Sequence, residues 1–337
     1  MNERILEQLE NVPCLFDNAQ IELERRAKEY AEKNNLSEQE KQRIRYELDK
    51  VKDWGIAKVF LFGFLLKEHS EGITISVENN CYLNYMVGLS PINPITYDLP
   101  LERFYNDKRP GLPIFNIYVK KGQKAKLLKR LYERFGVSCF CTGHDNSNVY
   151  YMSSKPIKDY IIKQRVIVSK IGEETYRENI SILSQYELEK LGYYSFGIIE
   201  VKDFRIVEKK KFSAKEIYNK LKEDFYYKMM TFTSIKDFDE IKDILKESQN
   251  KLVYQKQVID ILSRVYNCSL EEADYYRREF AKGFRYKLKD IRDFLIEKYP
   301  DKGEKFFYYL YNNVRHTVSK AFLISKLQTE IDWIEEE

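Results

Sequence analysis

Two cysteines and a histidine stand close enough together in the sequence to be considered as metal ligands. They form the pattern Cys139-x-Cys141-x2-His144. Structural zinc sites use these residue types, but they require four ligands and usually have a wider spacing between the first two cysteines. The other cysteines lie far away along the chain: Cys14, Cys81 and Cys268. The pattern therefore favours a buried strand end followed by a turn at Gly143, with a zinc site as the alternative.

A cluster of basic residues in the last third of the chain could bind phosphate. Its members follow the start of a predicted helix: Arg277, Arg278, Lys282, Arg285 and Lys287. Arginine suits phosphate because its planar guanidinium group donates two parallel hydrogen bonds. Acidic residues precede the cluster, namely Glu271, Glu272 and Asp274. A plain solvated helix face is therefore the alternative to a phosphate site.

The overall composition indicates a folded chain with a highly charged surface. Its 337 residues suggest about two domains. Hydrophobic residues make up 43% and charged residues 33%, a balance that is typical of globular proteins and not of disordered ones. The net charge of +4 is too small to establish nucleic-acid binding by itself.

Neither a membrane span nor a secreted protein is expected. The longest apolar run, from Val59 to Leu66, is too short to cross a bilayer. The first ten residues are too acidic and polar for a signal peptide. The odd number of cysteines, 5, at irregular spacing argues against a disulfide scaffold. We therefore expect a cytoplasmic location and no membrane partner.

The first 205 residues are predicted to mix helices and strands. A capping box, Ser37 with Glu40, starts a helix that ends at Gly55. Other helices are expected at 19–35, 82–89 and 125–135. Runs of β-branched and aromatic residues predict strands at 73–77, 113–119, 149–152 and 193–201.

After about residue 205 the pattern predicts helices only. Two further capping boxes, Ser213 with Glu216 and Ser269 with Glu272, mark helix starts. Val258 and the apolar residues after it indicate an amphipathic helix, and more helices are expected at 289–298, 303–311 and 318–333. We therefore divide the chain into residues 1–205 and residues 206–337.

Several short motifs resemble the palm and fingers of bacterial C-family DNA polymerases, the replicative polymerase III alpha subunits. The sharpest is Tyr-Met-Val-Gly-Leu-Ser-Pro-Ile-Asn-Pro at 85–94. Weaker matches follow in the order of the family: 45–48, 101–106, 149–160, 185–192, 254–258, 272–278 and 322–329. The resemblance implies an α+β fold, in which a nucleotidyltransferase-type palm with a mixed sheet precedes an all-α fingers domain.

The same resemblance indicates that the chemistry of the family is missing. Members of the family hold two Mg²⁺ ions with carboxylates, and Mg²⁺ requires oxygen ligands, preferably charged ones. The matching positions hold other residue types: Ile114, Asn116, Tyr118 and Gly197. Asn116 offers only a neutral oxygen, and a tyrosine phenol stays protonated at neutral pH. We therefore expect no catalytic residue, no bound metal and no cofactor.

Other parts of the family pattern also differ. The glycine-rich phosphate loop is replaced by residues 76–81, which include Glu78, and its charge would repel phosphate. Residues 314–318 replace the stretch near the triphosphate but hold Arg315, and Lys320 follows. The thumb and the histidinol-phosphatase-like domain of the family are expected to be absent.

Three functions are compatible with these observations. The first is an inactive polymerase relative, not an enzyme, that binds primer–template or single-stranded DNA as an accessory protein in replication or repair. The candidate DNA- or phosphate-binding residues are Arg277, Arg278, Lys282, Arg285, Arg315 and Lys320. The second is a protein-interaction module that binds and regulates a replisome component. The third is an enzyme with relocated metal ligands, such as Glu200 and Asp203.

Overall fold

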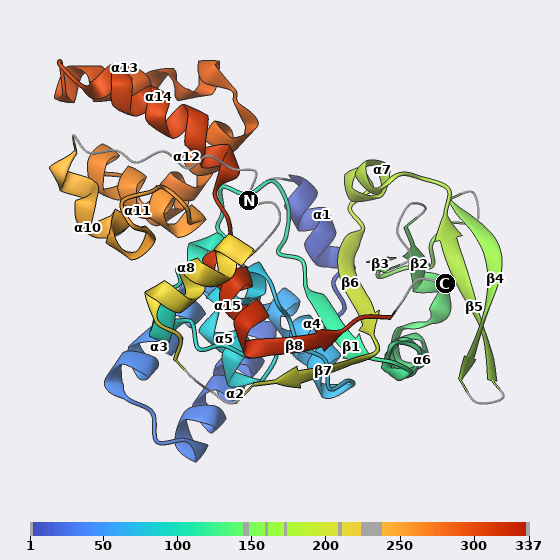
Figure 1. Ribbon diagram of the computed structural model, residues 1–337. Coiled ribbons are helices and arrows are strands. Elements are labelled where there is room, and N and C mark those ends of the chain that lie inside the picture. The colour runs from blue at the N-terminus through green and yellow to red at the C-terminus, as the bar shows by residue number, and fades with distance from the viewer. Residues whose placement is uncertain are drawn as a thin grey trace.

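The computed structural model describes residues 3–143, 148–158, 161–171, 174–207, 211–223 and 238–334. Figure 1 shows a sheet with helices packed against it and, beside it, a stack of helices from the second half of the chain. Within the described residues, no helix is both long and apolar enough to cross a membrane. The arrangement confirms the expected α+β class.

The larger sheet has six strands and mixed direction. In spatial order they are β1 (Asn116–Lys120), β6 (Tyr194–Val201), β3 (Val149–Met152), β2 (Phe140–Thr142), β5 (Glu174–Ser181) and β4 (Ile162–Ile171). β1 runs parallel to β6 and β2 runs parallel to β5, whereas the other neighbours are antiparallel. β1 is therefore an edge strand of this sheet.

Helices of the N-terminal part surround and cover this sheet. They are α1 (Glu3–Asn11), α2 (Ala19–Lys33), α3 (Glu38–Asp53), α4 (Ala57–Glu68), α5 (Tyr82–Met86), α6 (Gln123–Phe135) and α7 (Gln185–Lys190). α4 is almost entirely buried because it is apolar on every side. Its Gly63 lets the helix approach the sheet, since a Cβ atom there would lie 2.6 Å from the ring of Phe115.

Successive side chains of β1 and β6 lie in two different environments, one on each face of the sheet. Ile117 on β1 and Phe196 and Ile198 on β6 are buried in the main hydrophobic core with α4 and α6. Successive side chains of a strand point to opposite faces. The intervening residues, including Asn116 and Gly197, therefore lie on the face away from this core.

The second half of the chain is mostly helical. Its helices are α8 (Ala214–Glu223), α10 (Lys242–Leu245), α11 (Gln255–Tyr266), α12 (Leu270–Lys282), α13 (Lys289–Lys298), α14 (Gly303–Asn313) and α15 (Lys320–Gln328). Most buried hydrophobic residues between Phe238 and Val314 form a second hydrophobic cluster, separate from the main core of the N-terminal part. The capping box at Ser269 is present as predicted, and so are the two hydrogen bonds between Ser213 and Glu216.

The structure corrects two predicted elements. Residues 73–77 do not form a strand: Ile73 makes one isolated bridge to Tyr118, and the chain then turns into a 3-10 helix, η1 (Val77–Asn80). The last helix does not reach residue 333, because the chain becomes extended at Thr329 and forms β8 (Thr329–Asp332). β8 pairs with β7 (Asp203–Ile206), so the region after residue 205 is not helical throughout.

One motif that resembles the family, at residues 45–48, helps to hold two helices of the N-terminal part together. Glu47 on α3 is fully buried, and its carboxylate accepts hydrogen bonds from the backbone N–H groups of Tyr82 and Leu83 over 2.8 and 2.9 Å. Arg43 donates to the same carboxylate over 2.6 Å. The charge thus satisfies free N–H groups at the start of α5 and ties α3 to it.

Candidate functional site

The edge strand and its neighbour bring together two of the positions that the palm resemblance singles out. Asn116 on β1 pairs in register with Gly197 on β6. The N–H of Gly197 donates to the carbonyl of Phe115 over 2.8 Å. A Cβ atom at position 197 would lie 2.3 Å from Asn116 Oδ1. The Asn116 side chain therefore occupies the space that any side chain at position 197 would need.

The carboxyl group of Glu78 lies against this strand pair. Glu78 is fully buried in η1, and its Oε1 accepts hydrogen bonds from the Asn116 N–H over 3.0 Å and from Asn116 Nδ2 over 3.3 Å. Its Oε2 is buried without a hydrogen-bond partner. Burial raises the pKa of Glu78, and the hydrogen bonds from Asn116 offset only part of that increase.

This donor set does not fit two Mg²⁺ ions. Mg²⁺ takes six oxygen ligands in near-octahedral geometry. Ile114 and Gly197 have no side-chain oxygen, Asn116 has one neutral oxygen, and the Glu78 carboxyl is directed at Asn116. Across the described part of the chain, no group of three or more His, Cys, Asp and Glu side chains is placed to hold a metal ion.

Tyr118, the remaining position on β1, lies beneath the C-terminal strand. Its ring makes an edge contact with Trp333, with centroids 6.1 Å apart. It also belongs to a small apolar cluster that contains Phe322 and Ile331. α15 and β8 therefore help to close this part of the sheet face with apolar contacts.

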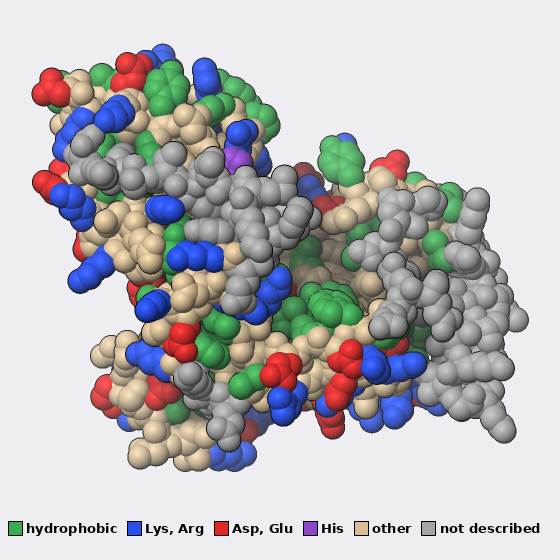
Figure 2. All heavy atoms as spheres, viewed as in Figure 1, with side chains coloured by type: hydrophobic (Ala, Val, Ile, Leu, Met, Phe, Trp, Pro, Cys, Tyr) green, Lys and Arg blue, Asp and Glu red, His purple; other side chains and the backbone are tan. Residues whose placement is uncertain are grey.

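A cleft of about 420 Å³ opens next to Asn116, where the surface is hollowed between the sheet and the helical part (Figure 2). Ile114 and Asn116 line it on the sheet side, and Arg278 lines it from α12. Its other charged residues are Arg4, Arg109 and Glu189. Arg4 pairs with Glu189 over 2.8 Å. The remaining charge of the cleft is therefore positive.

A single buried carboxylate on α12 collects several arginines. Asp274 is fully buried and accepts hydrogen bonds from Arg277 Nε over 2.9 Å and from Arg109 Nη2 over 3.2 Å. Arg278 Nε lies 3.6 Å away, and Asn106 Nδ2 donates over 3.0 Å. We call Asp274 and these four partners the Asp274 cluster. It joins the loop before β1 to the helical part.

The positive charges of this cluster outnumber the negative one. Burial by itself would raise the pKa of Asp274, but the surrounding arginines outweigh burial and hold that pKa below its usual value. Burial and neighbouring positive charges lower the pKa of Arg109 to about 10. They also lower the pKa of nearby Arg103, which donates to Gln255 over 2.6 Å, to about 9. Arg109 and Arg103 therefore remain charged at neutral pH.

The predicted phosphate-binding residues are not all equally placed for the task. Arg277 is only 6% exposed and pairs with Asp274, which makes it less accessible to a phosphate than the exposed residues of the cluster. Arg278 lines the cleft and also donates to the carbonyl of Lys108. Lys282, Arg285 and Arg315 are exposed. Phosphate binding remains a prediction for these residues.

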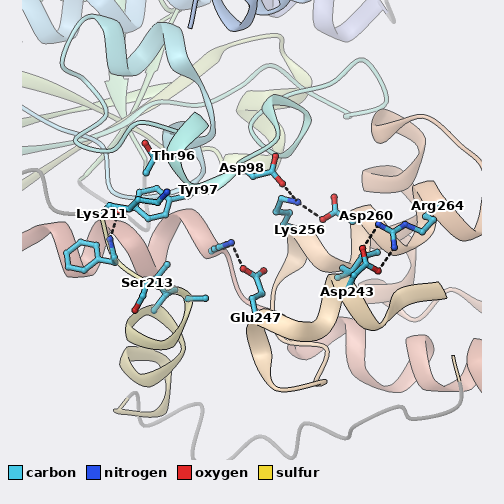
Figure 3. A pocket seen from close by; sticks show the side chains of 15 residues that line it. Thr96, Tyr97, Asp98, Lys211, Ser213, Asp243, Glu247, Lys256, Asp260 and Arg264 are labelled. Carbon is cyan, nitrogen blue, oxygen red and sulfur yellow. Dashed lines mark hydrogen bonds and ion pairs between the residues drawn. The ribbon is translucent and has the colours of Figure 1, made fainter. Parts of the chain in front are cut away.

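Lys320 lies at a second cavity, of about 490 Å³, between α8, α10, α11 and α15 (Figure 3). Its ammonium group pairs with Glu247 over 2.6 Å. Lys256 pairs with Asp98 over 2.9 Å in the same wall, and Arg264 pairs with Asp243 there. Because opposite charges are matched in this wall, the cavity offers phosphate less attraction than the cleft does.

The proposed metal ligands lie apart or are engaged elsewhere. Cys139 packs in the main core, whereas Cys141 packs in a different cluster beneath α7, so the two thiols do not face one space. His144 lies outside the described residues. Glu200 accepts from the N–H of Gly122 over 2.7 Å, and Asp203 pairs with Lys120 over 2.8 Å. These contacts do not favour a relocated metal centre.

The sequence interpretation missed two arginines of this region. Arg103 ends the 3-10 helix η3 (Leu101–Arg103), and Arg109 lies in the loop between η3 and β1; both are far in sequence from the basic run on α12. Arg103 belongs to the motif at 101–106 that resembles the family, and this motif was the sequence feature that could have indicated a functional role for it. Neither spacing nor periodicity indicates that both lie near Asp274.

Comparisons with known proteins agree with this architecture. Residues 16–145 match the family model of the bacterial DNA polymerase III alpha NTPase domain, and residues 214–303 match that of the bacterial DNA polymerase III alpha subunit finger domain. The chain is therefore a partial relative of the bacterial DNA polymerase III alpha subunit, with matches in both its N-terminal and its helical part.

Three curated proteins show local similarity. A probable DNA polymerase of Bacillus subtilis (strain 168) and a DNA-directed DNA polymerase of Bacillus phage SPbeta are each 43% identical over 54 residues, which are 16% of this chain and 4% of those proteins. An error-prone DNA polymerase of Corynebacterium efficiens is 27% identical over 106 residues, which are 30% of this chain and 10% of that protein. The similar segments thus span a small share of the relatives.

Replacing Asp274 by asparagine should destabilise the protein strongly. Asp274→Asn keeps the shape but leaves buried arginines without a counter-charge, so we expect the free energy of unfolding to fall by about 3–5 kcal/mol. Chemical denaturation at neutral pH measures it. The control Asp293→Asn, at an exposed position on α13, should change this free energy by less than about 0.5 kcal/mol. If Asp274→Asn and Asp293→Asn lowered the free energy of unfolding by the same small amount, the Asp274 cluster would not be holding the two parts together.

Replacing Glu78 by glutamine should change the pH dependence of stability. Because the pKa of Glu78 is raised above 4.5 in the folded protein, its contribution is fully present below that value and is lost as the pH rises through the folded-state pKa. Glu78→Gln removes this titration. Denaturation curves between about pH 4 and 8 should therefore show the variant gaining stability relative to the parent as the pH rises. A constant difference between the two proteins would contradict this prediction.

Proposed function

We propose that this chain is a catalytically inactive relative of the polymerase III alpha subunit that binds DNA as an accessory protein in replication or repair. The observation that carries the first half is the contact between Glu78 and Asn116 beside Gly197. It supports inactivity because the Asn116 side chain donates to the Glu78 carboxyl group and packs against Gly197, so neither of these two positions offers a charged oxygen to a metal ion.

The arrangement of positive charge beside the cleft supports the DNA-binding half of the proposal. Arg109 and Arg278 face the cleft beside Asn116, and Lys282 and Arg285 follow on the exposed end of α12 and the loop after it. Positive side chains that stand along one path can neutralise successive phosphates of a DNA backbone. Such binding does not require catalytic metal ions, so it could be retained when the carboxylates are lost.

The purified protein should incorporate no nucleotide into a primer–template in the presence of Mg²⁺ or Mn²⁺. The double variant Asn116→Asp, Gly197→Asp should not gain activity, because Ile114 and Tyr118 still offer no carboxylate and the buried Glu78 carboxyl group remains beside position 116. Denaturing gel electrophoresis of a labelled primer measures extension. Template-directed extension by the parent protein that is lost in Asn116→Ala would overturn the proposed inactivity.

Binding to a primer–template should be measurable and dependent on salt. Fluorescence anisotropy of labelled DNA should show affinity falling steeply between about 50 and 200 mM salt. The double variant Arg278→Ala, Lys282→Ala should bind more weakly and lose about two from the slope of log affinity against log salt. The control Lys28→Ala, at an exposed position on α2, should bind like the parent. Absence of binding at low salt would refute a DNA-binding function.

A further inference from the structure

The loop between α12 and α13 carries an unusual concentration of exposed aromatic rings. Tyr286 is 74% exposed, Phe284 is 41% exposed, and Tyr308 on neighbouring α14 is 37% exposed. Figure 2 shows hydrophobic and basic side chains close together over the helical part of the molecule. Exposed rings of this size usually have a binding role when they gather in one place. We call Phe284, Arg285, Tyr286, Lys287, Tyr308 and Tyr311 the aromatic platform.

Contacts within the platform hold its rings and charges in defined positions. The rings of Phe284 and Tyr286 lie 5.9 Å apart. The guanidinium group of Arg285 lies 4.7 Å from the ring centre of Tyr311 and 5.8 Å from that of Tyr308. Lys287 Nζ lies 5.5 Å from the ring centre of Phe284. Cations thus alternate with rings over one surface.

The backbone fixes this loop where α12 ends. Gly283 has a φ of +74°, in the left-handed region that favours glycine, and closes the helix. The hydroxyl of Tyr311 donates to the carbonyl of Gly283 over 3.1 Å. The Tyr311 ring in turn stacks on buried Phe307. The platform is therefore built on the hydrophobic core of the helical part.

Charge on the platform favours an anionic ligand. Glu279 is the carboxylate beneath it, and it is only 3% exposed. It pairs with Lys282 over 3.1 Å and with Lys287 over 3.3 Å, while Arg285 is held over aromatic rings. Two lysines and one arginine therefore stand against one buried carboxylate. A ligand approaching from solvent meets cations and ring faces.

We propose that the aromatic platform binds unpaired nucleotides. Bases would stack on Tyr286, Phe284 and Tyr308, and Arg285 and Lys287 would contact the adjoining phosphates. Single-stranded nucleic acid presents these two features together, since each base has a flat face and each link carries a negative charge. A duplex presents phosphates but keeps its bases stacked on one another. This inference rests on the proposed DNA-binding function and adds a preference for single strands.

The test compares a labelled single-stranded DNA oligonucleotide with a blunt duplex of the same length by fluorescence anisotropy. Tyr286→Ala should weaken single-strand binding by about tenfold, the effect of losing one stacked base. It should change duplex binding by less than about twofold, because no base of a duplex reaches the ring. A parallel single-stranded RNA arm decides whether the platform distinguishes the two sugars.

Two variants serve as controls. Phe16→Ala removes another partly exposed ring beside an arginine, Arg26, in the N-terminal part of the molecule, and should bind like the parent. Tyr286→Trp keeps a stacking surface and should retain single-strand affinity. Its added fluorescence should be quenched by the oligonucleotide, above the background from Trp54 and Trp333. Thermal unfolding followed by circular dichroism confirms that each variant is folded.

The outcomes separate this inference from the proposed function. If Tyr286→Ala and the parent bind the single strand equally, the platform proposal is overturned while DNA binding stands. Equal weakening on single strand and duplex would also overturn it, because the ring would then not read unpaired bases. If the parent binds neither DNA nor RNA at low salt, the proposed function fails and the platform proposal fails with it.

Discussion

One buried negative charge joins the N-terminal part of this molecule to its helical part, beside apolar packing and other polar contacts between the two. Asp274 lies on α12, yet Asn106 and Arg109, from the loop before β1, contact it. A buried carboxylate is tolerated only when charged and hydrogen-bonding partners compensate for the loss of water. The cluster therefore positions α12 against the loop before β1. It also places the exposed end of that helix, where the aromatic platform begins, relative to the cleft.

Buried carboxyl groups also contribute to the polymerase-like frame of the N-terminal part. Glu47 is compensated by helix N–H groups and Arg43, and it holds α3 and α5 together. Glu78 is compensated only in part, by Asn116, and one of its oxygens has no partner. Motifs that resemble the family are thus largely structural here, whereas Asn116 and Gly197, two of the four positions that the resemblance assigns to metal binding, pack against each other. The residues that stabilise the fold, such as Glu47, are thus different from those at the predicted metal-binding positions, such as Asn116.

The local grouping of charged side chains matters more for ligand binding than the net charge of the chain does. The net charge is only +4, and many of the cations are neutralised by nearby carboxylates, as in the cavity of Figure 3. At the cleft and at the aromatic platform, in contrast, cations outnumber the carboxylates beside them. These unmatched cations are the ones to which the proposed function and the further inference assign phosphate contacts. This contrast links the proposed function to the inference about unpaired nucleotides.

Local sequence signals determined much of the secondary structure. The capping boxes at Ser37 and Ser269 and the helix at 289–298 lie where the sequence predicted them, because caps and amphipathic faces depend on residues three or four apart. Strands at 149–152 and 193–201 were also found, apart from small differences at their ends. The boundary near residue 205 and the phosphate-binding roles remain predictions.

Only the tertiary structure decided the site. Three pairings join segments that are distant in sequence: Asn116 with Gly197, β7 with β8, and Asp274 with Arg109. No local pattern specifies such contacts, since each depends on how separate elements pack. For this reason residues 73–77 and 329–332 were assigned the wrong elements: their backbone hydrogen bonds are determined by distant partners, Tyr118 and β7. That these positions lack the catalytic carboxylates of the family is a prediction from the sequence, and the fold shows that two of them, Asn116 and Gly197, pair on neighbouring strands.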